Sequence, residues 1–485
     1  MPDKGLPLAA EIGGWVVVIY VFAVMAFYMF LFLVAFRKLR READIHTVHY
    51  GELLHSAFSP PLSILVPAYN EEKNIVDSVR SLLGMNYPLY EVIVINDGSK
   101  DGTKDRMIEE FDMYEVKHQV LWTSRKETKP VRGVYRSRKH PGLVVLDKEN
   151  GGKADALNAG IHYSQYPYFV SLDGDTVLDA DAFLKIMKPI VEAKPGEEII
   201  ASGGSVGIAN GSIVDRGHLA RGDVRLSGRP IVIMQVIEYM RGFLIGRIGL
   251  SRFNMLLIVS GAFGVFRKDW VLEAGGYEVG TIGEDMELVV RLHRLIREKG
   301  SKAKIAYIPD PVCWTEAPET MKVLKRQRVR WQRGLFESLW KHRRMVLNPR
   351  YGKIGLVAMP YFLFVELLGP ILELIGYAIA VWGLFTGHTQ LYFSFLLFLS
   401  MLLYGSFLSM GAVLLEEWTL SKYNRVSDVT RLFFWALSET FWYRPIQTVW
   451  RLNGLFKSLR GKRHEWGEMT RKGISVESQR KRTGG

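Results

Sequence analysis

The clearest structural signal in the chain is Tyr168-Phe169-Val170-Ser171-Leu172-Asp173-Gly174-Asp175, an apolar run that ends in two carboxylates. Two earlier runs, Ser63-Ile64-Leu65-Val66-Pro67 and Val92-Ile93-Val94-Ile95, are also short and apolar, and each ends in polar turn residues. This pattern predicts buried parallel strands followed by loops. Ligands of open α/β sheets bind at the carboxyl ends of such strands. The sequence therefore predicts an α/β domain with its site at that edge.

An apolar segment precedes this domain. Residues 12–36 carry no charged side chain, and they are long enough to cross a hydrocarbon core of about 30 Å. Arg37, Lys38, Arg40 and Arg41 follow directly. The segment is too long for a signal peptide, so we expect a retained transmembrane helix. The positive-inside rule then places residues 1–11 outside the cytoplasm and the linker 37–60 inside it.

Further apolar stretches follow the domain, and 354–384 and 391–415 are predicted to be transmembrane helices. The first contains Glu366 and Glu373. Intramembrane carboxylates tend to face protein or water. In one interpretation this stretch therefore lines a polar route through the membrane. In the other interpretation it begins as an interfacial helix and crosses with its second half.

Residues 429–456 are apolar but interrupted by charged side chains, which favours an interfacial or re-entrant segment. Residues 457–485 form a basic tail that belongs in the cytoplasm. The pattern thus predicts a multi-pass protein of the cell membrane, with its soluble domain in the cytoplasm.

The composition excludes several classes of protein. The net charge is +13, but much of the basic excess lies beside apolar spans and in the tail, where the headgroups of the lipid bilayer are the natural partner. We see no zinc finger, RNA-recognition signature or basic zipper, so no nucleic-acid partner is expected. The single cysteine, Cys313, excludes an internal disulfide and a cysteine cluster for zinc.

The carboxylates Asp173 and Asp175 are spaced so that they can share a divalent cation, although the tripeptide alone could be a polar turn. Asp173-Gly174-Asp175 is similar to the metal-binding DxD motif of glycosyltransferases with the GT-A fold. The resemblance implies that these residues hold Mg²⁺ or Mn²⁺, ions that suit carboxylate and diphosphate oxygens. Such an ion neutralises charge on the leaving diphosphate of a nucleotide sugar.

Two upstream segments resemble the nucleotide-binding opening of family-2 glycosyltransferases. They are Pro67-Ala68-Tyr69-Asn70-Glu71 and Val94-Ile95-Asn96-Asp97-Gly98-Ser99. The resemblance implies donor contacts from Pro67, Tyr69 and Glu71, and places Asp97 on the base or ribose. Gly151-Gly152-Lys153-Ala154 is similar to a Gly-Lys-Ala segment of the same family, which implies that Lys153 faces the diphosphate. A glycine turn with a solvated lysine is the structural alternative.

Gly283-Glu284-Asp285 precedes an apolar pattern at helical spacing, where carboxylates are favoured for structural reasons alone. In family-2 enzymes this Glu-Asp position supplies the catalytic base. The resemblance implies that Asp285, with Glu284 beside it, accepts the proton of the acceptor hydroxyl and inverts the anomeric carbon. Val259-Ser260-Gly261-Ala262-Phe263-Gly264-Val265-Phe266-Arg267 resembles the acceptor-side strand of polymerising family members, which places Ser260 and Gly261 near the acceptor. A plain buried strand is the alternative.

Gln327-Arg328-Val329-Arg330-Trp331 resembles the QxxRW signature of processive, membrane-embedded synthases such as cellulose, chitin, hyaluronan and poly-N-acetylglucosamine synthases. The resemblance implies that Gln327 and Arg330 bind the donor and that Trp331 offers a flat face to the acceptor sugar. We expect amphipathic interfacial helices over 317–353. A basic helix that grips lipid headgroups is the alternative; it would use Lys322, Lys325, Arg326, Arg328 and Arg333.

Together the motifs predict a Rossmann-like, nucleotide-sugar-binding GT-A domain over 61–316, with flanking transmembrane and interfacial helices. The resemblance implies an inverting, metal-dependent, processive enzyme that polymerises a β-linked polysaccharide from UDP-N-acetylglucosamine or UDP-glucose and helps to move it across the membrane. One alternative is a single addition to a lipid or lipid-linked acceptor. Another is a catalytically inactive membrane scaffold or nucleotide sensor that retains the fold. So few spans also suggest an accessory export subunit, and the basic stretch 125–140 has no assigned role.

Overall fold

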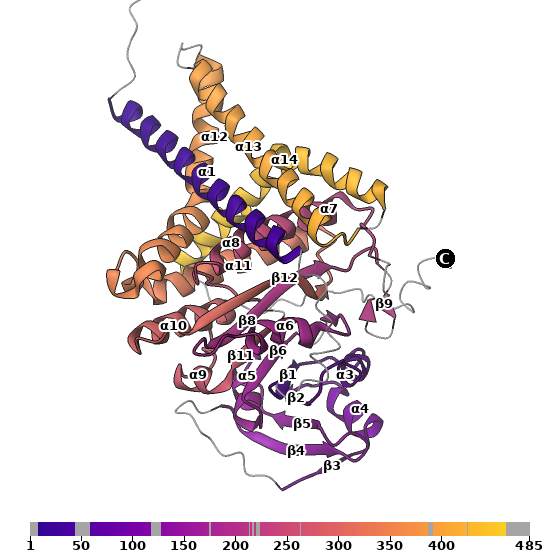
Figure 1. Ribbon diagram of the computed structural model, residues 1–485. Coiled ribbons are helices and arrows are strands. Elements are labelled where there is room, and N and C mark those ends of the chain that lie inside the picture. The colour runs from indigo at the N-terminus through magenta and orange to yellow at the C-terminus, as the bar shows by residue number, and fades with distance from the viewer. Residues whose placement is uncertain are drawn as a thin grey trace, which may run out of the picture.

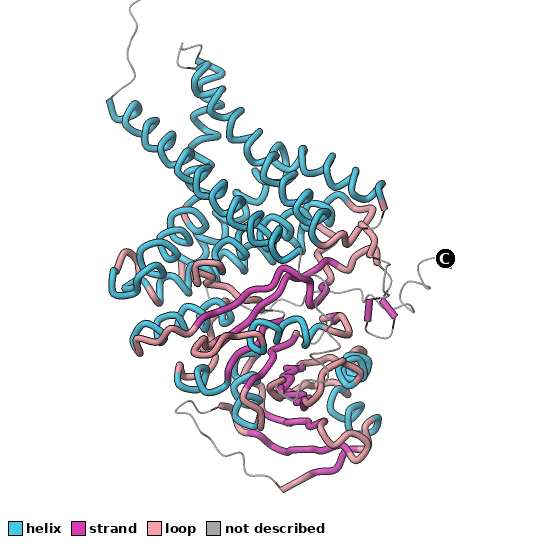
Figure 2. The backbone as a smooth tube through the Cα atoms, in the orientation of Figure 1, coloured by secondary structure: helices cyan, strands magenta, loops and turns pink. Residues whose placement is uncertain are grey.

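Parallel strands occupy the centre of one mixed sheet of twelve strands, as the sequence predicts. The computed structural model describes residues 8–43, 59–117, 128–173, 176–212, 214–215, 218–219, 224–261, 263–386, 391–423 and 425–461. Asp175 and the first residues of the basic stretch 125–140 lie outside these ranges. Figures 1 and 2 show the sheet with its helices in the lower part and long helices standing above it.

The three predicted strands are neighbours. β1 (Leu62–Ala68) pairs in parallel with β2 (Tyr90–Asp97) on one side and with β6 (Tyr168–Leu172) on the other. β5 (Leu143–Lys148) extends the parallel set beyond β2. All four are almost wholly buried. Asp97 and Asp173 therefore emerge at the same edge of the sheet, which confirms the predicted α/β class.

The remaining strands complete the sheet in the order β3-β4-β5-β2-β1-β6-β11-β8-β12-β7-β10-β9. Among these, β11 runs antiparallel to β6 and β8, and β12 runs parallel to β8. Their bounds are β3 (Met113–Glu115), β4 (Val131–Ser137), β7 (Val177–Leu178), β8 (Ile199–Ile208), β9 (Val214–Asp215), β10 (His218–Leu219), β11 (Phe263–Arg267) and β12 (Lys304–Thr315).

Helices cover the sheet and carry two of the predicted motifs. α5 (Lys153–Tyr163) packs on β1 and β2, and a Cβ at Gly160 would lie 3.0 Å from Ile95 Cδ1, so the two elements are in tight contact. α10 (Glu284–Glu298) begins at the Glu-Asp pair. The others are α3 (Ile75–Leu83), α4 (Thr103–Glu110), α6 (Ala182–Val191) and α9 (Lys268–Glu273).

The upper helices come from both ends of the chain and from its middle (Figure 1). They are α1 (Leu8–Ala43), α7 (Pro230–Met240), the π-helix η1 (Arg241–Arg247), α8 (Ile248–Ser251), α11 (Met321–Lys341), the 3-10 turns η2 (Arg343–Met345) and η3 (Pro349–Tyr351), the π-helices η4 (Ile354–Ala358) and η5 (Tyr361–Leu367), α12 (Gly369–Thr386), α13 (Leu391–Thr419) and α14 (Val426–Leu459).

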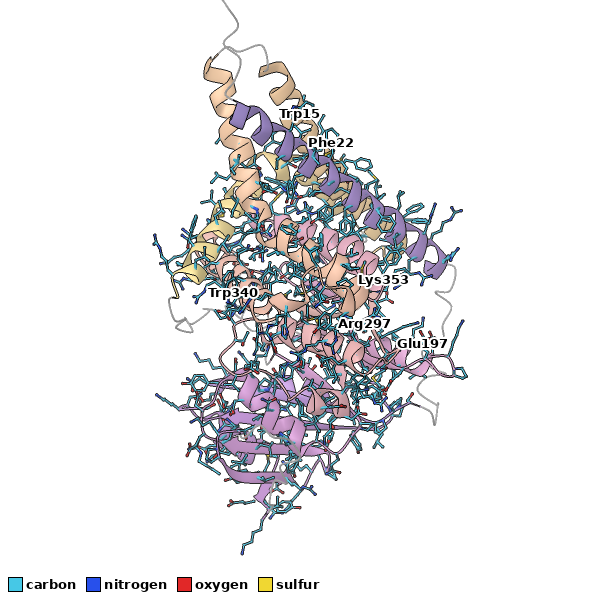
Figure 3. All side chains as sticks on the ribbon, turned by 90° about the vertical axis from the view of Figure 1, so that its left-hand side faces the viewer. Trp15, Phe22, Glu197, Arg297, Trp340 and Lys353 are labelled. Atoms are coloured by element: carbon cyan, nitrogen blue, oxygen red, sulfur yellow. The ribbon has the colours of Figure 1, made fainter. Side chains whose placement is uncertain are left out.

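Within the described residues, one helix is long and apolar enough to cross a membrane, Val18–Arg41. A second candidate arises if Ile354–Leu367 and Gly369–Ala378, which meet at a bend of 41°, are counted as one span. The predicted span 354–384 is thus two π-helices followed by α12, while the predicted interfacial segment 429–456 lies within the continuous helix α14. Trp15 and Phe22 project outward from α1 (Figure 3), each more than half exposed.

Candidate active site

A buried lysine organises the carboxyl ends of β2 and β5. Lys148 is fully buried, and its Nζ lies 2.7 Å from Asp97 Oδ1 and 2.6 Å from Asp155 Oδ2. Asp97 also accepts hydrogen bonds from the backbone N–H groups of Gly151 (3.0 Å, to Oδ1) and Gly152 (2.8 Å, to Oδ2). Both oxygens of Asp97 are therefore engaged with the protein. The structure gives Asp97 a positioning role, while its contact with a base or ribose stays a prediction.

Sequence reasoning missed Lys148 and Asp155. A lysine within a short polar stretch, here residues 147–150, has the pattern of a solvated charge. The available signal was its place at the end of the apolar run Leu143–Leu146, because that run becomes the buried strand β5.

Lys153 brings three predicted motifs together. It is the first residue of α5, and its Nζ donates to Asp173 Oδ1 at 2.6 Å and to the carbonyl oxygen of Gly261 at 3.1 Å, with Glu284 Oε1 3.7 Å away. Burial opposes the charged form, but Asp173 and Glu284 outweigh it and raise the pKa of Lys153 above its ordinary value. Lys153 is thus held as a cation among carboxylates, which excludes the solvated-lysine alternative.

The two carboxylates at the start of α10 have different surroundings. Burial, reinforced by the nearby charge of Asp285, raises the pKa of Glu284 to about 7, although Lys153 opposes the shift. Asp285 instead approaches the backbone, because a Cβ at Gly261 would lie 2.8 Å from Asp285 Oδ2. A larger residue at position 261 would displace this carboxylate from its present place. Glu284 faces the lysine, and Asp285 faces the segment Ser260–Gly261.

A glycine-to-glycine contact joins this helix start to the signature helix α11. A Cβ at Gly334 would lie 3.0 Å from the Cα of Gly283, and a Cβ at Gly283 would lie 3.0 Å from the Cα of Gly334. Beside the crossing, the N–H of Ile282 donates to Glu337 Oε2 at 2.9 Å. The position of Glu284 and Asp285 is therefore set by direct backbone contact with α11.

The residues of the signature segment on α11 differ in exposure. Trp331 is 43% exposed, while Arg328 is buried and lies over the Trp331 ring at 4.2 Å. Of the basic residues that a headgroup-binding helix would use, Lys322, Lys325 and Arg326 are exposed and Arg328 and Arg333 are buried. Arg328 thus belongs to the interior, a role that its place in a basic run concealed.

One cavity of about 3300 Å³ connects the predicted site residues. Each of them that the structure describes lines it: Pro67, Tyr69, Glu71, Asp97, Lys153, Asp173, Ser260, Gly261, Glu284, Asp285, Gln327, Arg330 and Trp331. The same cavity reaches Tyr20 of α1, Glu373 of α12, Tyr404 of α13 and Arg444 of α14. The edge of the sheet and the upper helices therefore share one continuous space.

The donor set at Asp173 fits a hard divalent ion. The Asp173 side chain is 35% exposed, with Oδ1 on Lys153, and Asp175 lies outside the described residues. Across the part of the chain that is described, no three His, Cys, Asp or Glu side chains gather closely enough to hold a metal ion by themselves. The carboxylate oxygens of Asp173 are of the kind that Mg²⁺ binds, and such sites commonly take their remaining ligands from substrate phosphates and water.

Comparisons with known proteins agree with this geometry. Residues 63–199 match the model for glycosyl transferase family 2, and residues 168–410, half of the chain, match glycosyl transferase family group 2. The chain is 30% identical over 281 residues to poly-beta-1,6-N-acetyl-D-glucosamine synthases of Staphylococcus epidermidis and Staphylococcus aureus (strain COL). These matches cover 57% of this chain and 55% of each relative, so the chain spans about half the length of the curated relatives that it matches.

Two solved structures are similar at low identity. A mannosyltransferase from Pyrobaculum calidifontis in complex with GDP-Man and Mn²⁺ is 17% identical, with a TM-score of 0.49, over 88% of this chain and 99% of that one. The glucosyl-3-phosphoglycerate synthase from Mycobacterium tuberculosis with Mn²⁺, UDP and glucosyl-3-phosphoglycerate is 16% identical, with a TM-score of 0.36, over 60% of this chain and 84% of that one.

Proposed function

This chain belongs to glycosyl transferase family group 2 and has a GT-A catalytic domain, and from that premise we propose that it is a processive, inverting, metal-dependent polysaccharide synthase. The donor is a UDP-sugar, and the product is a β-linked polymer that the same chain helps to pass across the membrane. UDP-N-acetylglucosamine is the favoured donor over UDP-glucose, because the relatives at 30% identity are named for poly-beta-1,6-N-acetyl-D-glucosamine synthesis.

The observation that carries the proposal is the continuity of the cavity. It begins among Asp97, Lys153 and Asp173, passes Trp331, and continues between α1, α12, α13 and α14. A transferase that adds one sugar to a lipid would have to place the apolar tail of its acceptor in the extension, where charged side chains such as Glu373, Arg444 and Arg451 line the space. A growing chain needs both parts, since each addition must be followed by movement away from the site.

In the proposed reaction each of these side chains has a separate role. Asp285 accepts the proton of the acceptor hydroxyl as that oxygen attacks the anomeric carbon, which yields an inverted, β-linked product. Lys153 moves from Asp173 toward the diphosphate and supports its negative charge. Trp331 supplies an apolar face for the terminal sugar of the acceptor. A divalent ion held by Asp173 and Asp175 neutralises charge on the departing diphosphate when it is bound.

The decisive experiment gives the purified protein labelled UDP-N-acetylglucosamine or UDP-glucose with Mn²⁺ and measures UDP release, linkage and product length. We expect polymer from UDP-N-acetylglucosamine. Asp285→Asn should abolish elongation and still bind UDP, and retained turnover would remove Asp285 from the base role. A product with one added sugar supports the lipid-acceptor alternative, and silence with all common nucleotide sugars contradicts the proposal.

We also propose a multi-pass topology with the catalytic domain in the cytoplasm. The chain suits a labelling test because its one cysteine, Cys313, is buried. In intact cells an impermeant maleimide should label Lys4→Cys, in the outer segment, and spare Lys322→Cys until the membrane is opened. The reverse pattern contradicts the proposed orientation. The accessory export subunit stays a prediction, tested by whether the purified chain alone moves polymer into sealed vesicles.

A further inference from the structure

Arg328 is the most enclosed charged residue of the signature. Its side chain is 3% exposed, and both terminal nitrogens have protein partners. Nη2 donates to Glu238 Oε2 at 2.7 Å, and Nη1 donates to the side-chain oxygen of Gln327 at 3.1 Å. Because these nitrogens are engaged, binding of the donor diphosphate is not the role that the geometry gives Arg328.

Arg328 contacts the aromatic residue of the signature as well. Its guanidinium lies 4.2 Å from the centre of the Trp331 ring. A cation this close to an indole face is attracted to it, and the attraction is strongest where water is excluded. Arg328 therefore holds two of the signature residues, Gln327 by a hydrogen bond and Trp331 by its ring.

Glu238 connects Arg328 to α14, which lines the far part of the cavity. Glu238 lies on α7, and its Oε2 also accepts from the hydroxyl of Tyr443 and from the side-chain nitrogen of Gln447, each at 2.9 Å. Tyr443 and Gln447 both belong to α14. Burial disfavours the carboxylate, but Arg328, Gln447, Arg241 and Tyr443 together outweigh it and lower the pKa of Glu238.

We infer that Arg328 is a positioning residue for the acceptor, which fixes Trp331 and is itself anchored through Glu238 to α14. The inference rests on the proposed function, because it assigns Trp331 to the acceptor. Its new content is a mechanical link. The Arg328–Glu238 ion pair joins the surface that receives the sugar to α7, and hydrogen bonds to Glu238 connect it to α14, a helix that lines the onward path. A shift of α14 therefore changes the position of Trp331.

The test separates positioning of the acceptor from stability and from donor binding. Arg328→Met keeps the length of the side chain and removes its charge, while Arg326→Met makes the same change at an exposed position of the same helix. We expect Arg328→Met to raise the KM for a chito-oligosaccharide acceptor by about 10-fold and to shorten the polymer. The affinity for UDP with Mn²⁺ should stay unchanged. Arg326→Met should match wild type in all three measurements.

Three further variants keep the test decisive. Removal of one partner leaves a buried charge alone, which can unfold the protein, so Glu238→Gln combined with Arg328→Met removes both charges at once. A double-mutant cycle with Trp331→Ala shows whether Arg328 acts through the ring. We expect the double variant Arg328→Met, Trp331→Ala to be no weaker with acceptor than Trp331→Ala alone.

Each outcome has a distinct meaning. If Arg328→Met keeps the wild-type KM for the acceptor and the wild-type product length, the inference is overturned. It is also overturned if the effects of Arg328→Met and Trp331→Ala on acceptor KM are fully additive in the double variant. An equal loss of UDP affinity shows a purely structural role and also overturns it. A wild-type protein that is silent with all donors refutes the proposed function before variants are compared, and the inference fails with it.

Discussion

Replacement of Gly334 by alanine tests whether the crossing of α10 and α11 sets the catalytic geometry. The new Cβ would lie 3.0 Å from the Cα and 3.1 Å from the N of Gly283. Carbon atoms rest about 3.5 to 4.0 Å apart, so the start of α10 must move by roughly 0.5 Å or more. Because both atoms belong to the backbone, a side-chain rotation cannot relieve the contact.

The magnitude follows from two opposing effects on stability and one on catalysis. Alanine stabilises a helix interior by about 1 kcal/mol relative to glycine, while overpacking costs about 1 to 3 kcal/mol. The net loss of stability is therefore about 0 to 2 kcal/mol. A shift of about 1 Å at reacting groups can cost about 100-fold in rate, so we expect kcat to fall by about 10-fold or more as Asp285 leaves its place beside Gly261.

The assay is the rate of UDP release at saturating donor, with the midpoint of thermal unfolding measured on the same preparation. Gly376→Ala is the matched control, because it is also a helical glycine but a Cβ there would meet no atom within 4 Å. A Gly334→Ala variant with wild-type kcat refutes the claim that this crossing positions Asp285. A fall in kcat equal to that of Gly376→Ala refutes it too.

Three other changes have defined outcomes. Lys148→Met leaves the buried carboxylates of Asp97 and Asp155 without their counter-ion and should destabilise the protein by about 3 to 5 kcal/mol in denaturant titrations. The exposed Lys100→Met should have little effect. Equal stability of the two variants contradicts a stabilising role for the buried Lys148. Burial lowers the pKa of His293 from 6.5 to about 4. Its contribution to the free energy of unfolding is therefore complete above pH 6.5 and falls by about 3 kcal/mol as the pH drops toward 4. His293→Gln should weaken the pH dependence of the unfolding midpoint over that range, and an unchanged pH dependence shows that His293 is not its cause. Chelation with EDTA should reduce UDP release by at least about 100-fold and added Mn²⁺ should restore it, while full activity in EDTA contradicts metal dependence.

The central strands could be predicted because their signal is local. The runs that become β1, β2 and β6 are short, rich in β-branched residues and closed by turn residues, and in a parallel sheet such runs are buried on both faces. Their order in space follows from the same rule, since their loops must meet at one edge. Asp97 and Asp173 could thus be assigned to one site before the sheet was known.

Long-range pairs between charged residues could not be predicted. Lys148 and Arg328 both sit in polar stretches, where a positive charge normally indicates a solvated side chain. Their burial depends on partners far away in the chain, Asp97 for Lys148 and Glu238 for Arg328. No spacing rule connects such pairs, because they meet through the packing of α7, α11 and α14 or through the register of β2 and β5.

Lys153 has a consequence for the order in which ligands arrive. Its ammonium group is paired with Asp173 and lies near Glu284, so a free divalent ion has to compete with a positive charge for the Asp173 carboxylate. A nucleotide diphosphate changes that balance, because it draws the ammonium group to itself and leaves the Asp173 carboxylate without its counter-ion. Under the proposed function we therefore predict that ion and nucleotide bind together, so the kinetics should show one compulsory binding step for their complex rather than two independent ones.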